Sequence, residues 1–172
     1  GGLACARHLV NRDVPVEVLL DRSPSKLSGS VAHQYQIVDE MGVPTTTGVD
    51  LLEGSDEQVV VDALVGYGLD GEVRSPAREC IDAVNGGSHP TVSLDVPSGV
   101  DATTGETLGV AVSPDRTVTL ALPKTGLETV DGVLFLADIG IPKTVYTRLG
   151  IGYQDPFVKR DWIELEHHSS PR

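Results

Sequence analysis

Cysteine and long apolar runs are scarce in this sequence of 172 residues. The two cysteines, Cys5 and Cys80, have no metal-ligand spacing and fall on apolar positions of predicted helices, which is typical of buried, reduced thiols. No apolar run approaches the ~20 residues that a membrane-spanning helix needs. We therefore expect neither a thiolate metal site nor a membrane protein, and we expect a reducing, cytoplasmic compartment.

Positive charge is also scarce. Thirteen Lys and Arg residues stand against 25 Asp and Glu residues, which gives a net charge of -12. Such a surface repels a phosphate backbone over most of its area, so nucleic acid is not an expected partner. The acidic composition leaves two explanations open, a protein adapted to high salt and an ordinary acidic cytosolic protein.

Strands and helices alternate along the chain, and this pattern predicts one α/β domain with a parallel sheet covered on both faces. We expect helices over residues 3–11, 23–41 and 75–86. Strands are expected over residues 14–20, 59–65, 91–96, 116–122 and 133–137, with residues 59–65 forming a central strand buried on both faces. The domain is predicted to cover residues 1–164, with a tail at 165–172, and the opening at Gly1, inside a motif, predicts a preceding segment.

Asp62 stands inside the β-branched strand Val-Val-Val-Asp-Ala-Leu-Val. An ionised carboxylate is costly to bury unless a partner compensates its charge. Capping by backbone N–H groups, or a shorter strand that leaves Asp62 in water, would satisfy this requirement. A cation bound by hard oxygen ligands is the functional alternative.

A Gly-x-Gly-x-x-Gly pattern follows this strand and runs from Gly66 to Gly71. In a dinucleotide-binding βαβ unit the last glycine lies in the first turn of the helix, whereas here the helix is expected to begin near Ser75 and Pro76. Glycines still allow close backbone approach, and successive N–H groups can hold a phosphate. A tight turn without a ligand is an equal alternative.

Asp95 and Ser98 lie at the carboxyl end of the strand predicted over residues 91–96, the edge at which open α/β sheets gather ligands. A carboxylate in such a crevice can act as a general acid or base. Asp101 is more typical of a turn, and Lys124 is expected to be a solvated loop lysine. The histidines have no metal spacing and no neighbouring nucleophile, so a hydrolase triad has no support.

Six blocks over residues 2–142 together resemble the NAD(P)H-hydrate epimerase family, also called the YjeF N-terminal domain. They are Gly-Leu-Ala-Cys-Ala-Arg-His-Leu, Asp-Ala-Leu-Val-Gly-Tyr-Gly-Leu-Asp-Gly, Leu-Asp-Val-Pro-Ser-Gly-Val-Asp, Thr-Gly-Glu, Leu-Pro-Lys-Thr-Gly-Leu and Ala-Asp-Ile-Gly-Ile-Pro. The resemblance implies a Rossmann-like, three-layer αβα sandwich with a mostly parallel sheet. It also implies an isomerase that epimerises the C6 hydroxyl of hydrated NADH or NADPH in cofactor repair.

By the same resemblance, Asp62 and Ser98 would bind a potassium ion, and Asp95 would contact the hydrated nicotinamide ring as the catalytic residue. Inversion at C6 requires the hydroxyl to leave as water, or the ring to open, and Asp95 is expected to donate and retake the proton. The residues expected to bind the dinucleotide, besides Asp95, are Gly66, Tyr67, Gly68, Leu69, Asp70, Gly71 and Glu72. A homodimer and a fused or separate dehydratase are the protein partners considered.

The sequence departs from the family at its beginning, where the helix that the family has before its first motif is not expected. The family usually has Asn-Asn-Gly-Gly-Asp before its Gly-Leu, and here only Gly1 and Gly2 remain. The alternatives are a non-catalytic module of the same fold that binds a dinucleotide or a protein, and a flavodoxin-like flavin protein.

Overall fold

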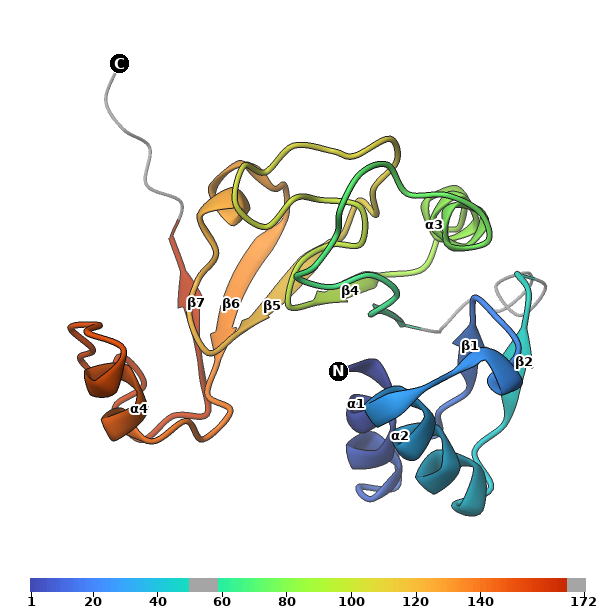
Figure 1. Cartoon of the computed structure of the whole chain (residues 1–172), viewed down its shortest axis with the longest axis horizontal. Helices are drawn as coiled ribbons and strands as arrows, with labels where there is room; N and C mark the ends of the chain where they lie inside the picture. Colours follow the sequence, from blue (N-terminus) through green and yellow to red (C-terminus); the bar gives the residue numbers. More distant parts are fainter. Residues whose placement is uncertain (50–58, 167–172) are drawn as a thin grey trace.

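The computed structural model of the chain describes residues 1–49 and 59–166, which form helices and two sheets with mostly parallel strands (Figure 1). Along the chain the elements are α1 (Gly2–Val10), β1 (Val18–Leu20), the 3-10 helix η1 (Pro24–Lys26), α2 (Gly29–Glu40), β2 (Thr45–Thr47), β3 (Val60–Asp62), α3 (Ala77–Gly86), β4 (Thr91–Leu94), β5 (Arg116–Leu120), the 3-10 helix η3 (Thr125–Thr129), β6 (Val133–Ala137), α4 (Lys143–Arg148) and β7 (Trp162–Leu165). Within these described ranges, no helix is long and apolar enough to cross a bilayer.

The larger sheet has the strand order β3-β4-β5-β6-β7. Its first four strands are parallel, and β7 is antiparallel to β6. The smaller sheet pairs β1 with β2 in parallel. The prediction of a Rossmann-like α/β fold with a mostly parallel sheet is therefore confirmed. Because parallel strands end at the same edge, the segments that follow β3, β4 and β5 meet at one rim of the larger sheet.

Apolar packing holds the elements in three clusters. Val38, Leu20 and Ala6 belong to the first, in which α1 and α2 cover the smaller sheet (Figure 1). Ile81 of α3 is fully buried in the second cluster, together with residues that follow β3. Leu127 of η3 is buried in the third, against the segment that follows β4. The second and third clusters therefore anchor the two loops that carry the predicted site residues.

The strand predicted over residues 59–65 is shorter and less buried than expected. It spans only Val60–Asp62, and Val59 and Val61 are 59% and 40% exposed. The prediction of burial on both faces was wrong because β3 is an edge strand, paired only with β4 among the described residues. Residues of β3 line a cavity of about 1390 Å³, and residues of β1 also line it. We call it the β1–β3 cavity.

Several element boundaries also differ from prediction. The helix expected over residues 23–41 is divided into η1 and α2, because Leu27 and Ser28 are extended and Gly29 has a φ of 58°. Ser-Gly-Ser at this point is a poor helix-forming sequence, so the break has a local cause. The sequence did not indicate β2, α4 or β7, and β7 includes Leu165, which was placed in the tail.

Candidate functional site

Asp62 is a buried polar hub at the end of β3, with only 2% of its surface exposed. Its Oδ2 accepts hydrogen bonds from Ser93 Oγ at 2.7 Å and from the backbone N–H of Ser98 at 2.8 Å. Its Oδ1 accepts from Ser98 Oγ at 2.5 Å and from the backbone N–H of Leu64 at 3.4 Å. These donors compensate the carboxylate without a cationic side chain, and they join β3 to β4 and to the loop that follows β4.

Ser98 connects this hub to the beginning of the glycine loop, residues 66–72. Its hydroxyl oxygen accepts a hydrogen bond from the backbone N–H of Val65 at 2.9 Å and lies 3.2 Å from the carbonyl oxygen of Val65. Ser98 is fully buried. The structure therefore brings Asp62, Ser98 and the start of the glycine loop together at one rim of the sheet.

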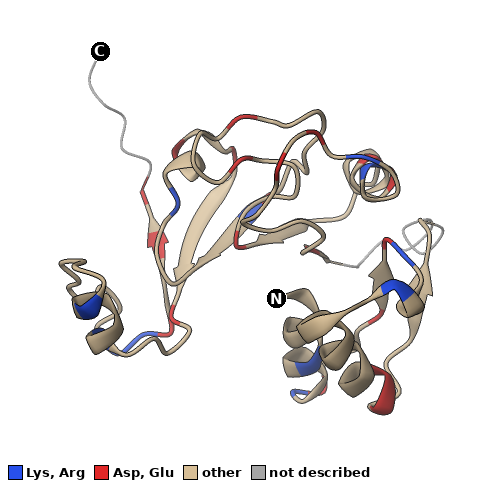
Figure 2. Cartoon of the chain, viewed as in Figure 1, with Lys and Arg blue, Asp and Glu red and all other residues tan. Residues whose placement is uncertain are grey.

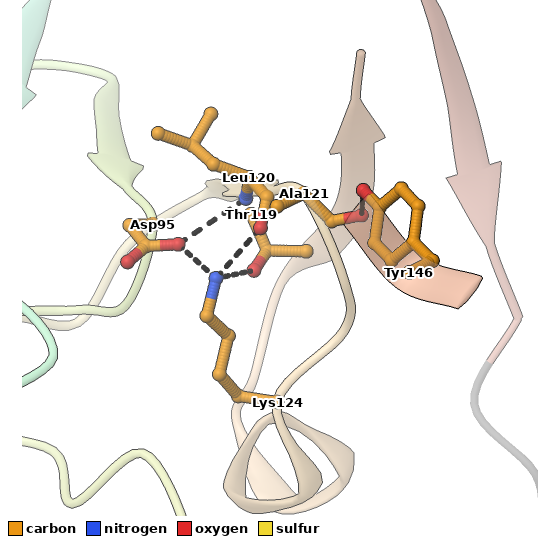
Figure 3. A network of polar contacts seen from close by, with 6 residues as sticks. All are labelled: Asp95, Thr119, Leu120, Ala121, Lys124 and Tyr146. Atoms are coloured by element: carbon orange, nitrogen blue, oxygen red, sulfur yellow. Dashed lines mark hydrogen bonds and ion pairs between the residues drawn. The ribbon is translucent and has the colours of Figure 1, made fainter. Parts of the chain in front are cut away.

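Asp95 lies next to this hub, one residue beyond β4, with a φ of 74°. Non-glycine residues rarely adopt this left-handed conformation, although aspartate tolerates it better than most. Its Oδ1 accepts a hydrogen bond from the backbone N–H of Leu120 at 3.2 Å and forms an ion pair with Lys124 Nζ (Figure 3). Strained backbone of this kind clusters at active sites, so the geometry marks Asp95 as a candidate functional residue.

Lys124 is the residue that sequence reasoning missed. It was expected to be a solvated loop lysine, but its side chain is only 16% exposed and its ammonium contacts Asp95. The prediction was wrong because β5 pairs directly beside β4, which brings the segment after β5 against Asp95. The signal that could have found it was the position of Lys124 just after a strand expected in the same parallel sheet.

The glycine loop and residues 100–103 enclose a small cavity of about 210 Å³. Its lining comes from Gly66, Tyr67, Leu69, Val100, Asp101, Ala102 and Thr103. Gly66 and Gly68 have no left-handed φ and have open space where a Cβ would stand. Neither backbone conformation nor packing therefore requires glycine there, whereas close approach of a ligand would.

Residues 69–72 of the glycine loop differ from Gly66 and Gly68 in conformation, burial and charge. Gly71 has a φ of 75°, so its own conformation accounts for glycine. Asp70 and Glu72 are exposed, while Leu69 packs against the second apolar cluster. Acidic residues recur along the loops that follow β3 and β4 (Figure 2). Because carboxylates repel phosphate, the part of the loop suited to an anion is the beginning, at Gly66–Tyr67–Gly68.

Asp101 forms the turn that its sequence context indicated. Its Oδ1 accepts hydrogen bonds from the backbone N–H groups of Thr103 and Thr104, both at 2.8 Å. The bond from Thr104, followed by that from Thr103, lowers the pKa of Asp101 below its ordinary value. This carboxylate shapes one wall of the small cavity, and its two hydrogen bonds give it a structural role.

The helix after the glycine loop begins at Ala77, so Gly71 lies outside its first turn. The loop therefore differs from a dinucleotide-binding Gly-x-Gly-x-x-Gly turn, as expected. No cluster of three or more His, Cys, Asp or Glu side chains suited to a metal occurs in the described ranges. Any cation here would depend on hydroxyl and carbonyl oxygens in addition to Asp62.

Comparison with known proteins shows which family the chain belongs to. The family model described as YjeF-related protein N-terminus matches residues 1–126. The chain is 42% identical over 168 residues to an NAD(P)H-hydrate epimerase of Dehalogenimonas lykanthroporepellens, a match that covers 96% of this chain and 67% of the relative. It is 40% identical to a bifunctional NAD(P)H-hydrate repair enzyme Nnr of Salinibacter ruber, with 86% of this chain and 31% of that relative covered.

A comparison of the fold with solved structures also finds a similar protein. The crystal structure of the yeast protein ynu0 superposes with a TM-score of 0.76 at 22% identity, covering 95% of this chain and 71% of the yeast chain. At that identity the superposition supports the fold alone. The chain spans less than a third of the Salinibacter relative and about two thirds of the Dehalogenimonas relative. The family model covers most of the chain, including Asp62, Asp95, Ser98 and Lys124, and the chain belongs to the family of YjeF-related protein N-terminal domains.

Proposed function

We propose that this chain is an NAD(P)H-hydrate epimerase, an isomerase that interconverts the two C6 epimers of hydrated NADH and NADPH. The observation that carries the proposal is the convergence of two features at one rim of the sheet. One is a loop whose Gly66 and Gly68 have no conformational or packing need for glycine. The other is Asp95, a carboxylate on strained backbone at the end of β4, the strand that pairs with β3. The names of the relatives, which describe epimerases and bifunctional repair enzymes, support the same activity.

The dinucleotide is proposed to bind with its phosphates against the beginning of the glycine loop. Backbone N–H groups at the beginning of the loop suit an anion, and Tyr67, which lines the small cavity and is 68% exposed, is available to contact a base or ribose. The proposed binding residues, besides Asp95, remain Gly66, Tyr67, Gly68, Leu69, Asp70, Gly71 and Glu72. The exposed carboxylates of Asp70 and Glu72 are better suited to sugar hydroxyls than to phosphate.

Asp95 is proposed to carry the proton chemistry. C6 of the hydrated ring bears both a hydroxyl group and the ring nitrogen, so its configuration inverts if the hydroxyl leaves as water and returns, or if the ring opens and closes again. Each route needs a group that exchanges a proton with the C6 hydroxyl. The Asp95 carboxylate, on strained backbone at the end of β4, is the group proposed for this exchange.

Potassium binding is also a proposal, and the donor set fits it. The Asp62 carboxylate, the Ser98 hydroxyl and the Val65 carbonyl oxygen are hard ligands in mutual contact. Asp62 has no cationic side chain beside it among the described residues, so a monovalent cation would offset its charge. A bound ion would supply positive charge beneath the substrate phosphates. The protein groups alone perform the proton transfer.

The partners of the proposed enzyme follow from the same reasoning. Bifunctional relatives combine this domain with further sequence under the name of a repair enzyme, so a dehydratase, fused or separate, is the proposed next step in repair. A homodimer and a cytoplasmic location are proposed as well. The location rests on Cys5 and Cys80, which are both free thiols.

The experiment starts from a single C6 epimer of hydrated NADPH and follows C6 by NMR in the presence of the protein. We expect equilibration of the epimers well above the spontaneous rate. Asp95→Asn should lower the rate by about 100-fold or more, because general acid–base catalysis contributes at least that factor, while asparagine tolerates the same φ and keeps the fold. Binding without faster exchange would identify the chain as a non-catalytic module instead.

A further inference from the structure

Lys124 is held more rigidly than its place on a loop would suggest. Its Nζ contacts Asp95 Oδ1, lies 2.8 Å from the Leu120 carbonyl oxygen and 3.2 Å from Thr119 Oγ1 (Figure 3). All three ammonium hydrogens therefore have acceptors. Fixing a lysine side chain costs rotamer entropy, so an ordinary loop lysine stays mobile in water.

Buried residues lie both before and after Lys124 in the chain. It immediately precedes η3, whose Leu127 is 1% exposed. Thr119 is fully buried in β5. One of the three acceptors is thus fully buried, and the segment that carries the ammonium is anchored by the buried Leu127.

The two carboxylate oxygens of Asp95 therefore differ in their hydrogen bonds. Oδ1 is occupied by Lys124 Nζ and the Leu120 N–H, whereas Oδ2 receives no hydrogen bond from the described residues (Figure 3). Oδ2 is therefore the oxygen that can accept a hydrogen bond or a proton from a bound molecule.

We propose that Lys124 is a positioning residue that holds Asp95 as an oriented carboxylate, so that Asp95 acts on the hydrated dinucleotide as a base through Oδ2. This inference rests on the proposed epimerase function and chooses the ring-opening route over the loss of water.

The step begins when Asp95 Oδ2 takes the proton of the C6 hydroxyl. The hydroxyl oxygen then forms a C=O bond to C6, and the C6–N1 bond breaks. Its electron pair moves to N1, which takes a proton from water. Ring closure on the other face reverses each transfer, so atoms and charges balance.

The kinetic test compares Lys124→Met, Lys124→Arg and the matched control Lys143→Met in the complete chain. Lys143 is an exposed lysine at the start of α4. We expect Lys124→Met to lower kcat by about 100-fold with KM within about threefold of the wild type, since Asp95 loses the ammonium that orients it while the binding loop is intact. Lys124→Arg should recover at least about a tenth of the wild-type kcat, and Lys143→Met should behave as wild type. A normal kcat in Lys124→Met, or a change confined to KM, would overturn the inference.

A second readout does not depend on activity. Because the Leu120 N–H donates to Asp95 Oδ1, its hydrogen exchange reports whether the carboxylate stays in place. We expect exchange at Leu120 to be about tenfold faster in Lys124→Met, with the amides of β6 unchanged. Equal exchange at Leu120 in both proteins would contradict the positioning role even if the wild type proved to have no epimerase activity, whereas an inactive wild type with the expected exchange change would reject only the proposed function.

Discussion

The Asp62 carboxylate is the residue on which the architecture of the rim most depends. Four protein donors converge on it, from Ser93, Ser98 and Leu64. Asp62→Asn places an amide N–H₂ group opposite some of these donors, and each hydrogen bond to a charged group contributes about 1.5–3 kcal/mol. We expect the free energy of unfolding in urea to fall by about 3 kcal/mol.

The matched control for this substitution is Asp131→Asn, because Asp131 is exposed. It should change stability by less than about 0.5 kcal/mol, as exposed substitutions usually do. A loss below about 1 kcal/mol in Asp62→Asn would show that the hub does not hold the rim together. Potassium chloride should stabilise the wild type more than Asp62→Asn, and an equal response would remove Asp62 from the proposed cation site.

Individual residues were predictable from sequence when their local context was unusual. A carboxylate in a run of valines indicated the burial of Asp62, and an aspartate at a strand end indicated the rim position of Asp95. Lys124 had an ordinary loop context, and its ion pair with Asp95 depends on the lateral order of β4 and β5, which spacing along the chain does not contain. The left-handed backbone conformation of Asp95 likewise could not be predicted from the sequence.

At the scale of elements, the loops after β3 and β4 contain glycines with opposite roles. Gly66 and Gly68 have open space at the Cβ position, whereas a Cβ on Gly99, which has a φ of 97°, would lie 2.0 Å from the Val110 carbonyl oxygen. We expect Gly68→Ala to leave the free energy of unfolding within about 1 kcal/mol of the wild type, because its conformation is accessible to alanine. Its KM for the hydrated dinucleotide should rise about tenfold, which corresponds to about 1.4 kcal/mol of binding.

Gly99→Ala is the contrasting variant. Its Cβ would overlap a backbone atom in a left-handed conformation, so we expect it to lose about 3 kcal/mol of stability. Thermal and urea unfolding of both variants, measured beside their KM values, separate the two roles. If Gly68→Ala bound substrate normally and lost stability, the glycine loop would be a structural turn and its proposed role in binding would be wrong.

Elements with a clear apolar pattern were predicted well, and the short elements β2 and α4 were not predicted. The strand expected over residues 133–137 matches β6, and the helix ending at Gly86 matches α3. The three-residue β2 and the six-residue α4 are too short to leave a periodic signal, so their presence depends on tertiary packing. Apolar content also predicted a central strand at β3, but burial depends on the neighbours of a strand, and β3 has only one in the described residues.

The whole molecule presents two strand edges, those of β1 and β3, to the β1–β3 cavity. Val59 and Val61 are exposed there, and free edges with apolar side chains are templates for association. We expect sedimentation velocity to show species larger than the 18.2 kDa monomer as protein concentration rises. Val61→Lys should reduce this association, since edge lysines oppose strand pairing.

The control for this experiment is Val133→Lys, at an exposed position of β6, a strand with neighbours on both sides. It should leave association unchanged. A monomer at every concentration would contradict the account of the β1–β3 edges. Equal effects of the two substitutions would place the association elsewhere on the surface.

The most direct measurement of the central claim, that the rim at the carboxyl edge of the sheet holds the hydrated dinucleotide, is a titration with hydrated NADPH followed by backbone amide NMR. The account predicts the largest shift changes at residues 66–72 and 95–103 and at Leu120 beside Asp95. Shift changes confined to the residues that line the β1–β3 cavity or to α4, or none at millimolar ligand, would contradict it.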